Sequence, residues 1–205
     1  MSFVAAGVHA GSLKIVNVNF PAIFCLFNTN CTSLVNDSTS PITLTNVAVT
    51  GYLQSRTFRG LPGTAEAGQY GYAYRIVLNN LAGSSTNSNV KISSLAMAYG
   101  AISSFSYNGQ ASNQVWVATK GGLGTVGPSS VSFTNSGFGN FIMVGFNFNP
   151  PIFLAGGTNQ GASSYFFGVI SSRAPTNATA VISGTVQLSP GKSVPFNFHL
   201  PVRTP

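Results

Sequence analysis

Apolar and polar residues alternate with a period of two along much of this chain. In the stretch QYGYAYRIVLNN, Tyr70, Tyr72, Tyr74, Ile76 and Leu78 fall on one side of an extended backbone, with Gly, Ala, Arg and Val on the other. The stretches SLKIVNVNF, NFIMVGFNFNP and SVPFNFHLPVR show the same alternation. Successive side chains of a strand point to opposite faces, so this pattern predicts β-strands.

Further strands and the turns between them follow from composition. The further predicted strands are Ile42–Tyr52, Ile92–Tyr99, Gln114–Thr119, Ser130–Thr134, Ser164–Ser171 and Ala178–Leu188. Asn108-Gly109 is a strong hairpin signal because both residues tolerate a positive φ. Asn149-Pro150-Pro151 and Pro190-Gly191 are expected to be loops. No stretch has a helical stripe, and Pro62–Gly68 is expected to form a single turn at most.

These elements predict one all-β domain over residues 1–205. About ten short strands, separated by turns rich in Gly, Asn, Ser and Pro, are typical of a β-sandwich with jelly-roll or immunoglobulin-like topology. Residues 1–10 are a candidate extended segment at the N-terminus. The last strand contains Pro195 and Pro201, and proline cannot donate to a ladder, so we expect this strand at a sheet edge. The aromatic residues, including Trp116, are expected in the core or in a subunit contact.

Composition narrows the class of protein. Of the 205 residues, 44% are hydrophobic and only 5% are charged, against roughly 25% charged residues in an ordinary soluble protein. This composition is typical of secreted, surface and fibre-forming proteins. No apolar run reaches the 18 or so residues that a transmembrane helix needs. The net charge of +7 reflects scarce acids, and the basic residues are scattered, so we do not expect nucleic-acid binding.

Groups that perform catalysis or bind metals are scarce. Asp37 and Glu66 are the only carboxylate side chains, and His9 and His199 are the only imidazoles. A glycosidase needs two carboxylates that flank one bond, and a catalytic zinc needs about three protein ligands. A Ser-His-Asp triad would have to use Asp37, and the chain has no Gly-x-Ser-x-Gly motif. We therefore predict no enzymatic activity, no metal site and no cofactor.

The two cysteines, Cys25 and Cys31, are predicted to form a disulfide. A zinc half-site needs two further ligands, and a redox motif needs Cys-x-x-Cys before a helix, and neither is present. Residues Phe24–Phe27 and Thr32–Val35 are expected to form two arms around the turn Asn28-Thr29-Asn30, which would bring the cysteines together. A loop this short would gain about 2–2.5 kcal/mol from the bond. A disulfide also indicates an oxidising compartment.

Three sequons agree with a location outside the cell. Asn30, Asn36 and Asn177 each begin an Asn-x-Ser/Thr sequence and are candidate glycosylation sites. The chain starts with MSFVAAGVHAGSLK, which lacks the basic region of a signal peptide, although VHA before Gly11 is similar to a cleavage site. We expect either that a leader lies outside this numbering or that export uses another route. The predicted location is extracellular or on the cell surface.

Three stretches carry a family resemblance. GYLQSRTFRGLPGTAEAGQYGYAYRI, GGLGTVGPSS and SSYFFGV resemble stretches of uncharacterised secreted bacterial β-sandwich proteins. The resemblance covers about residues 40–185 and implies an extracellular β fold. It implies no activity and no functional residue.

The favoured function is a secreted, non-enzymatic structural protein that self-assembles into an extracellular filament, sheath or layer. Its first residues are apolar, and they are a candidate strand that leaves its own domain and adds to the next subunit. The residues that would form this strand are Phe3, Val4, Ala5, Ala6 and Val8. The expected partner is thus another copy of the chain, as a homo-oligomer or polymer, with glycan as a second candidate partner. The alternative is an extracellular carbohydrate- or surface-binding module.

Overall fold

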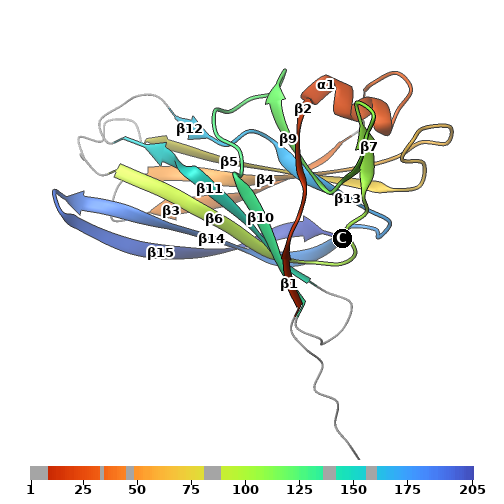
Figure 1. Ribbon diagram of the computed structural model, residues 1–205. Coiled ribbons are helices and arrows are strands. Elements are labelled where there is room, and N and C mark those ends of the chain that lie inside the picture. Colours follow the sequence, from red (N-terminus) through yellow and green to blue (C-terminus); the bar gives the residue numbers. More distant parts are fainter. Residues whose placement is uncertain (1–8, 33–34, 45–48, 81–88, 136–141, 156–160) are drawn as a thin grey trace, which may run out of the picture.

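The computed structural model describes residues 9–32, 35–44, 49–80, 89–135, 142–155 and 161–205. The predicted all-β sandwich is confirmed, because 71% of the described residues lie in strands and 4% in helices, with several sheets packed together. Two large sheets form the two layers of this sandwich (Figure 1).

Sheet A has six antiparallel strands. In spatial order they are β1 (His9–Ser12), β10 (Ser130–Asn135), β11 (Ile142–Leu154), β6 (Asn89–Tyr99), β14 (Thr176–Ser189) and β15 (Lys192–Thr204). The strands β1 and β15 are therefore its two edges.

Sheet B has seven strands. Six follow one another as β2 (Ile15–Asn19), β9 (Val115–Lys120), β13 (Phe167–Ser171), β5 (Tyr70–Asn80), β4 (Val49–Arg59) and β3 (Asn36–Leu44), and the short β12 (Ala162–Ser163) also pairs with β5. Among the described strands, only β2 and β9 pair in parallel. The remaining elements of the described residues are a separate hairpin, β7 (Phe105–Tyr107) and β8 (Gln110–Asn113), and two short helices, α1 (Phe20–Ile23) and η1 (Phe24–Leu26).

The main core lies between the two sheets and follows the predicted alternation. Tyr72 and Tyr74 of β5 and Val144 and Phe146 of β11 are fully buried. The Tyr74 ring contacts the Phe146 ring, with centroids 6.4 Å apart. Burying each side chain of this size stabilises the fold by about 2 kcal/mol, so the facing rows hold the two sheets together.

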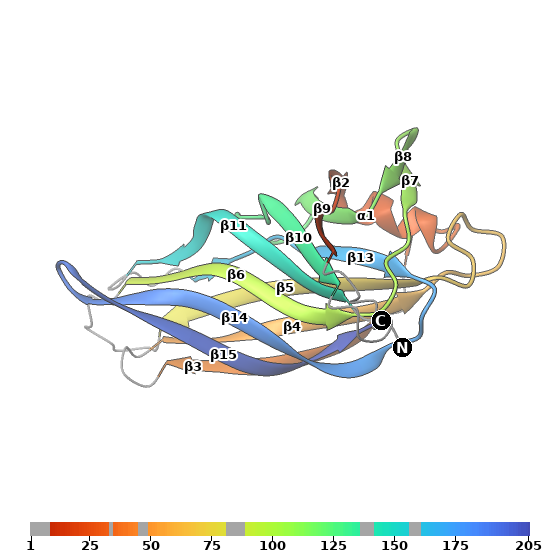
Figure 2. The same cartoon turned by 60° about the horizontal axis from the view of Figure 1, so that its bottom comes forward.

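A second core covers the outer face of sheet B. It is formed by apolar side chains from α1, η1, the β7–β8 hairpin and sheet B itself, among them Ile23, Phe27, Phe105, Trp116 and Phe166. Gly71 lies under the Phe58 ring, and a Cβ there would come within 2.1 Å of it, so the close packing requires glycine. Sheet B is thus buried on both faces over this region (Figure 2).

The helical segment over Phe20–Leu26 was not predicted. We expected Phe20 to continue a strand, but it begins α1, and Pro21 occupies the first turn, where its missing N–H costs nothing. Ile23 and Phe27 are fully buried four residues apart, as on one helix face. A helical segment of two turns contains too few repeats of the helical spacing to be recognised in the sequence, next to the two-residue alternation of the strand that precedes it.

Two other predictions need correction. The strand predicted over Ile42–Tyr52 is two antiparallel strands, because β3 ends at Leu44 and β4 begins at Val49 opposite it. Asn149-Pro150-Pro151 lies inside β11 and is not a loop. The prolines interrupt the hydrogen-bond ladder with a register shift against β6 between Asn147 and Ile152, but the strand continues.

The turn predictions at two hairpins are confirmed. Asn108 and Gly109 connect β7 to β8 with φ values of 51° and 74°. Pro190 and Gly191 connect β14 to β15. The proline-containing last strand, β15, lies at a sheet edge as predicted.

Candidate functional site

The predicted disulfide between Cys25 and Cys31 is confirmed, with a Cα–Cα distance of 4.0 Å. The first predicted arm, Phe24–Phe27, is largely helical, because Cys25 lies in η1, and residues 33 and 34 of the second predicted arm lie outside the described residues. The chain turns at the end of this helix, where the Asn28 N–H donates to the Phe24 carbonyl and the Cys31 N–H donates to the Asn28 carbonyl. Helical turns bring the two cysteines together.

The disulfide holds together a cap over sheet B, which consists of α1, η1 and the turn that the Cys25–Cys31 bond closes. Phe27 is fully buried, and its ring meets that of Phe58 edge to face at 4.7 Å. Main-chain hydrogen bonds join the cap to the β4–β5 connection: the Leu61 N–H donates to the Phe27 carbonyl, and the Glu66 N–H donates to the Leu26 carbonyl. The cap covers Trp116 of β9, which agrees with its predicted place in a core.

The three sequon asparagines are all exposed. Asn30 lies within the disulfide-closed turn, where its N–H donates to Asn28 Oδ1. Asn36 is the first residue of β3, and Asn177 lies near the start of β14. Each side chain could therefore carry a glycan without disturbing the core, and glycosylation stays a prediction.

The predicted inter-subunit strand falls at the start of the chain. Phe3, Val4, Ala5, Ala6 and Val8 lie outside the described residues. The last two residues of the predicted segment 1–10 belong to β1 of the same domain, since His9 and Ala10 pair with Asn135 and Thr134 of β10. The segment that could leave the domain is therefore residues 1–8.

The four outer strands of the two sheets differ in their prolines. Strands β1 and β2 end the two sheets on one side and contain no proline. On the other side, β3 contains Pro41, and β15 contains Pro195 and Pro201. These two strands meet where the Ser40 hydroxyl donates to the Pro201 carbonyl. Proline prevents continuous pairing at an exposed edge, so the β3 and β15 edges are partly protected.

The inward-facing side chains of β15 are covered at one end only. Leu200 and Val202 are buried, Phe196 and Phe198 are half-buried, and Val194 is 39% exposed. The Phe196 and Phe198 rings contact each other at 5.3 Å. The β14–β15 hairpin also reaches beyond the ends of the other strands in both views (Figure 1 and Figure 2). The first half of β15 therefore carries an apolar row that sheet B does not fully cover.

A hollow in the protein surface lies beside β1. It has a volume of about 510 Å³ and is lined by apolar residues, including Leu13, Ile102 and Phe133, and by polar residues, including Gln114 and Arg173. It lies close to the start of β1, because Asn135, the partner of His9, also lines it.

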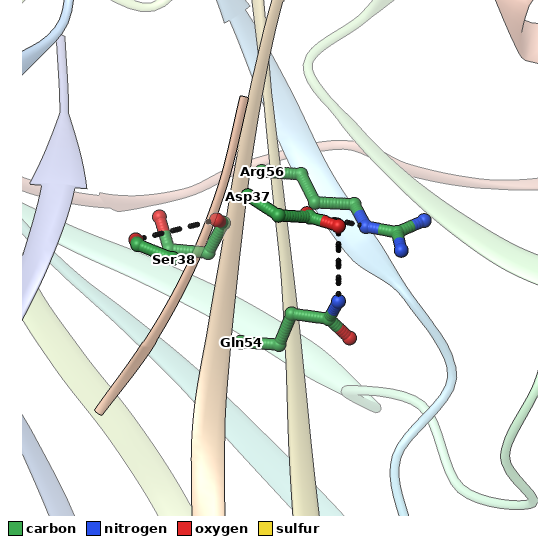
Figure 3. A network of polar contacts seen from close by, with 5 residues as sticks. Asp37, Ser38, Gln54 and Arg56 are labelled. Carbon is green, nitrogen blue, oxygen red and sulfur yellow. Dashed lines mark hydrogen bonds and ion pairs between the residues drawn. The ribbon is translucent and has the colours of Figure 1, made fainter. Parts of the chain in front are cut away.

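A polar network lies on the outer face of sheet B (Figure 3). Arg56 Nε is 2.7 Å from Asp37 Oδ1, and Gln54 Nε2 donates to Asp37 Oδ2. The Arg56 guanidinium lies over the Phe166 ring at 4.6 Å. Sequence patterns missed the pair because Asp37 and Arg56 face each other only through the β3–β4 pairing. The ion pair is partly exposed, so it contributes at most about 1 kcal/mol.

The other groups that could do chemistry do not gather. His9 and His199 lie on opposite edge strands of sheet A, while Asp37 is on β3 and Glu66 follows β4. Burial raises the pKa of the Glu66 carboxyl above its ordinary value. Among the described ranges, no three His, Cys, Asp or Glu side chains are grouped so that they could hold a metal ion.

Two of the three tyrosines of β5 are core residues. Tyr72 and Tyr74 are buried, as predicted for the aromatic residues, and their hydroxyls donate to the Arg173 and Arg203 carbonyls. Burial raises the pKa of both hydroxyls. Phe153, next to Lys91, is the aromatic side chain with the largest exposure in the described part of the chain, at 44%.

Comparisons of the chain with protein families, curated proteins and solved structures found no match. The resemblance to secreted bacterial β-sandwich proteins therefore stays a prediction. In the part of the chain that the structure describes, no helix is long and apolar enough to cross a membrane.

Proposed function

We propose that this protein is a secreted, non-enzymatic structural subunit that self-assembles outside the cell. In this proposal residues 1–8 of one subunit add as a β-strand to the next subunit. The observation that carries the proposal is that the edge strand β1 has no buried residue, although an apolar sequence precedes it.

Strand β1 contributes backbone pairing but no core. None of its four residues, His9–Ser12, is buried, and the first buried residue of the described chain is Leu13. The sequence before β1, MSFVAAGV, is nevertheless apolar and has no charged side chain. Apolar residues that precede an unburied edge strand support a role in contact with another molecule, because burying them is favourable.

Strand addition explains how a chain with so few charges could associate specifically. Main-chain hydrogen bonds would supply affinity, and alternate side chains would set the register. When the segment of each subunit binds a different surface on the next subunit, the contact is head-to-tail, and it extends into an open filament if the rotation between subunits does not close a ring. The disulfide and the exposed sequons support a location outside the cell.

The alternative, a carbohydrate-binding module, has less support. Such a module needs exposed aromatic rings on which sugar rings stack. Tyr72, Tyr74 and Trp116 are buried, and Tyr52 and Tyr70 are only half-exposed. The described aromatic residues thus serve mainly as core, which favours the assembly proposal.

Deleting residues 1–8 tests the proposal. We expect the full chain to form filaments or layers in negative-stain images. The deletion variant is expected to stay monomeric by light scattering and to keep its β-type circular dichroism. A variant in which Gly and Ser replace residues 1–8 controls for chain length and should also stay monomeric.

Two results would contradict the proposal. Polymers of the deletion variant, equal in amount to those of the full chain, would show that residues 1–8 do not join subunits. A full chain that stays monomeric up to millimolar concentration would show that the segment does not reach a neighbour, as expected if it turns back into the hollow beside its own β1.

A further inference from the structure

The backbone of β15 shows which residues face the open edge of sheet A. The Pro201 carbonyl accepts a hydrogen bond from Ser40, and the Arg203 carbonyl accepts one from Tyr74. Both donors belong to sheet B, so these carbonyls point away from β14. Backbone groups alternate in direction along a strand, and the β14–β15 register is regular over Ser193–Thr204, so the odd-numbered residues of β15 face the edge.

Two prolines interrupt the hydrogen-bond donors of this edge. Pro195 and Pro201 have no N–H, and between them the edge-facing residues are Asn197 and His199. No other group in the described ranges bonds to the backbone of these two residues at the edge. The same stretch of β15 carries the half-covered rings of Phe196 and Phe198.

We infer that Ser193–His199 of β15 is the acceptor edge, on which residues 1–8 of a neighbouring subunit dock as an additional strand of sheet A. This inference rests on the proposed function and specifies its acceptor. Alternate apolar side chains of the docked segment would cover Phe196 and Phe198, while its main chain would bond to Asn197 and His199.

The length of the segment indicates that the occupant comes from a second copy. Strands β1 and β15 are the opposite edges of a six-stranded sheet, so about 24 Å separates them at the usual spacing. Residues 1–8 reach about 26 Å when fully extended. Crossing its own sheet would use nearly the whole segment and leave no residues to pair with β15. From a neighbouring subunit, the whole segment is free to pair with Ser193–His199.

Proline substitutions at Asn197 and His199 test whether this part of β15 is the acceptor edge. The double variant Asn197→Pro and His199→Pro removes the two edge-facing N–H groups between Pro195 and Pro201, keeps that of Ser193, and leaves the bonds to β14 in place. Two net hydrogen bonds correspond to about a thirtyfold higher subunit concentration for polymer formation. The matched control is Thr39→Pro, which blocks the β3 edge next to Pro41 in the same way and is expected to polymerise like the unmodified chain. Circular dichroism and thermal melting check that both variants fold.

Hydrogen exchange on the unmodified chain gives a measurement that does not depend on a variant. We expect the amides of Asn197 and His199 to exchange at least tenfold more slowly in polymer than in monomer, and those of Thr39 and Thr43 to exchange equally in both. Normal polymerisation of the double proline variant, or protection of β3 in place of β15, would overturn the acceptor assignment. If the deletion of residues 1–8 still abolishes polymers in that case, the proposed function stands without it.

Discussion

At the scale of single residues, Glu66 is a carboxyl group whose burial makes the stability of the fold depend on pH. It lies in the connection between β4 and β5, and its backbone is tied to the disulfide cap through Leu26. Burial raises the pKa of its carboxyl. The folded protein therefore holds this proton more tightly than the unfolded chain does, so the contribution of Glu66 to stability is present at low pH and is lost as the pH rises through its folded pKa.

We predict that Glu66→Gln raises the melting temperature at pH 7. The two proteins should converge below about pH 4, where the carboxyl is protonated in both the folded and unfolded states. Thermal melts from pH 3 to pH 8 measure this difference. Asp37→Asn is the matched control, because it removes the other carboxylate from a partly exposed ion pair, and no gain is expected at pH 7. A Glu66→Gln variant that is less stable at neutral pH would contradict the prediction.

At the scale of elements, the disulfide cap is a small unit with a core of its own. Phe20 of α1 stacks on Phe166 at 5.0 Å and lies 6.2 Å from the Trp116 ring. The cap itself is only α1, η1 and the turn that the Cys25–Cys31 bond closes. Helices this short do not persist by themselves, so packing on sheet B and the disulfide hold them together.

We predict that reducing the disulfide, or replacing both cysteines by serine, destabilises the fold by about 2.4 kcal/mol through the entropy of the opened loop. For a chain of this size, this is a fall of about 5–10 °C in melting temperature. Trp116 fluorescence should shift to longer wavelength if the cap detaches, while the circular dichroism keeps its β signal. Unchanged melting and fluorescence after complete reduction would show that the cap does not depend on the bond.

At the scale of the whole molecule, charge opposes association. The net charge is +7, and in the described part of the chain only Arg56 and Asp37 form an ion pair. Subunits that approach each other therefore repel, and they gain little from complementary charges. Main-chain bonding and apolar contact have to exceed this repulsion.

We predict that added salt promotes assembly. Raising NaCl from about 0.01 M to 0.15 M shortens the screening length from about 30 Å to about 8 Å, so polymers should form faster and at lower subunit concentration. Light scattering over a salt series measures the effect, and the deletion variant lacking residues 1–8 is the control that should not respond. Polymers that dissolve as salt increases would instead indicate contacts held by opposite charges.

The acceptor edge was predictable only in part. The sequence indicates that β15 lies at an edge, because Pro195 and Pro201 cannot donate to a neighbour. It also places Phe196 and Phe198 on the inward face. It does not indicate that these rings are half-covered, since that depends on where β3 ends and on the reach of the β14–β15 hairpin beyond sheet B. The Asp37–Arg56 contact was likewise missed, because it requires the pairing of two strands that the pattern had merged.

What the sequence by itself determined is local. The period of two places Tyr72, Tyr74 and Phe146 in the core, Asn108-Gly109 sets a turn, and the short separation of Cys25 and Cys31 predicts their bond. Tertiary structure alone decided the strand order, the second core under the cap and the short helix that forms it. Those features depend on contacts between residues far apart in the chain, and a helix of two turns is stabilised by what it packs against more than by its own sequence.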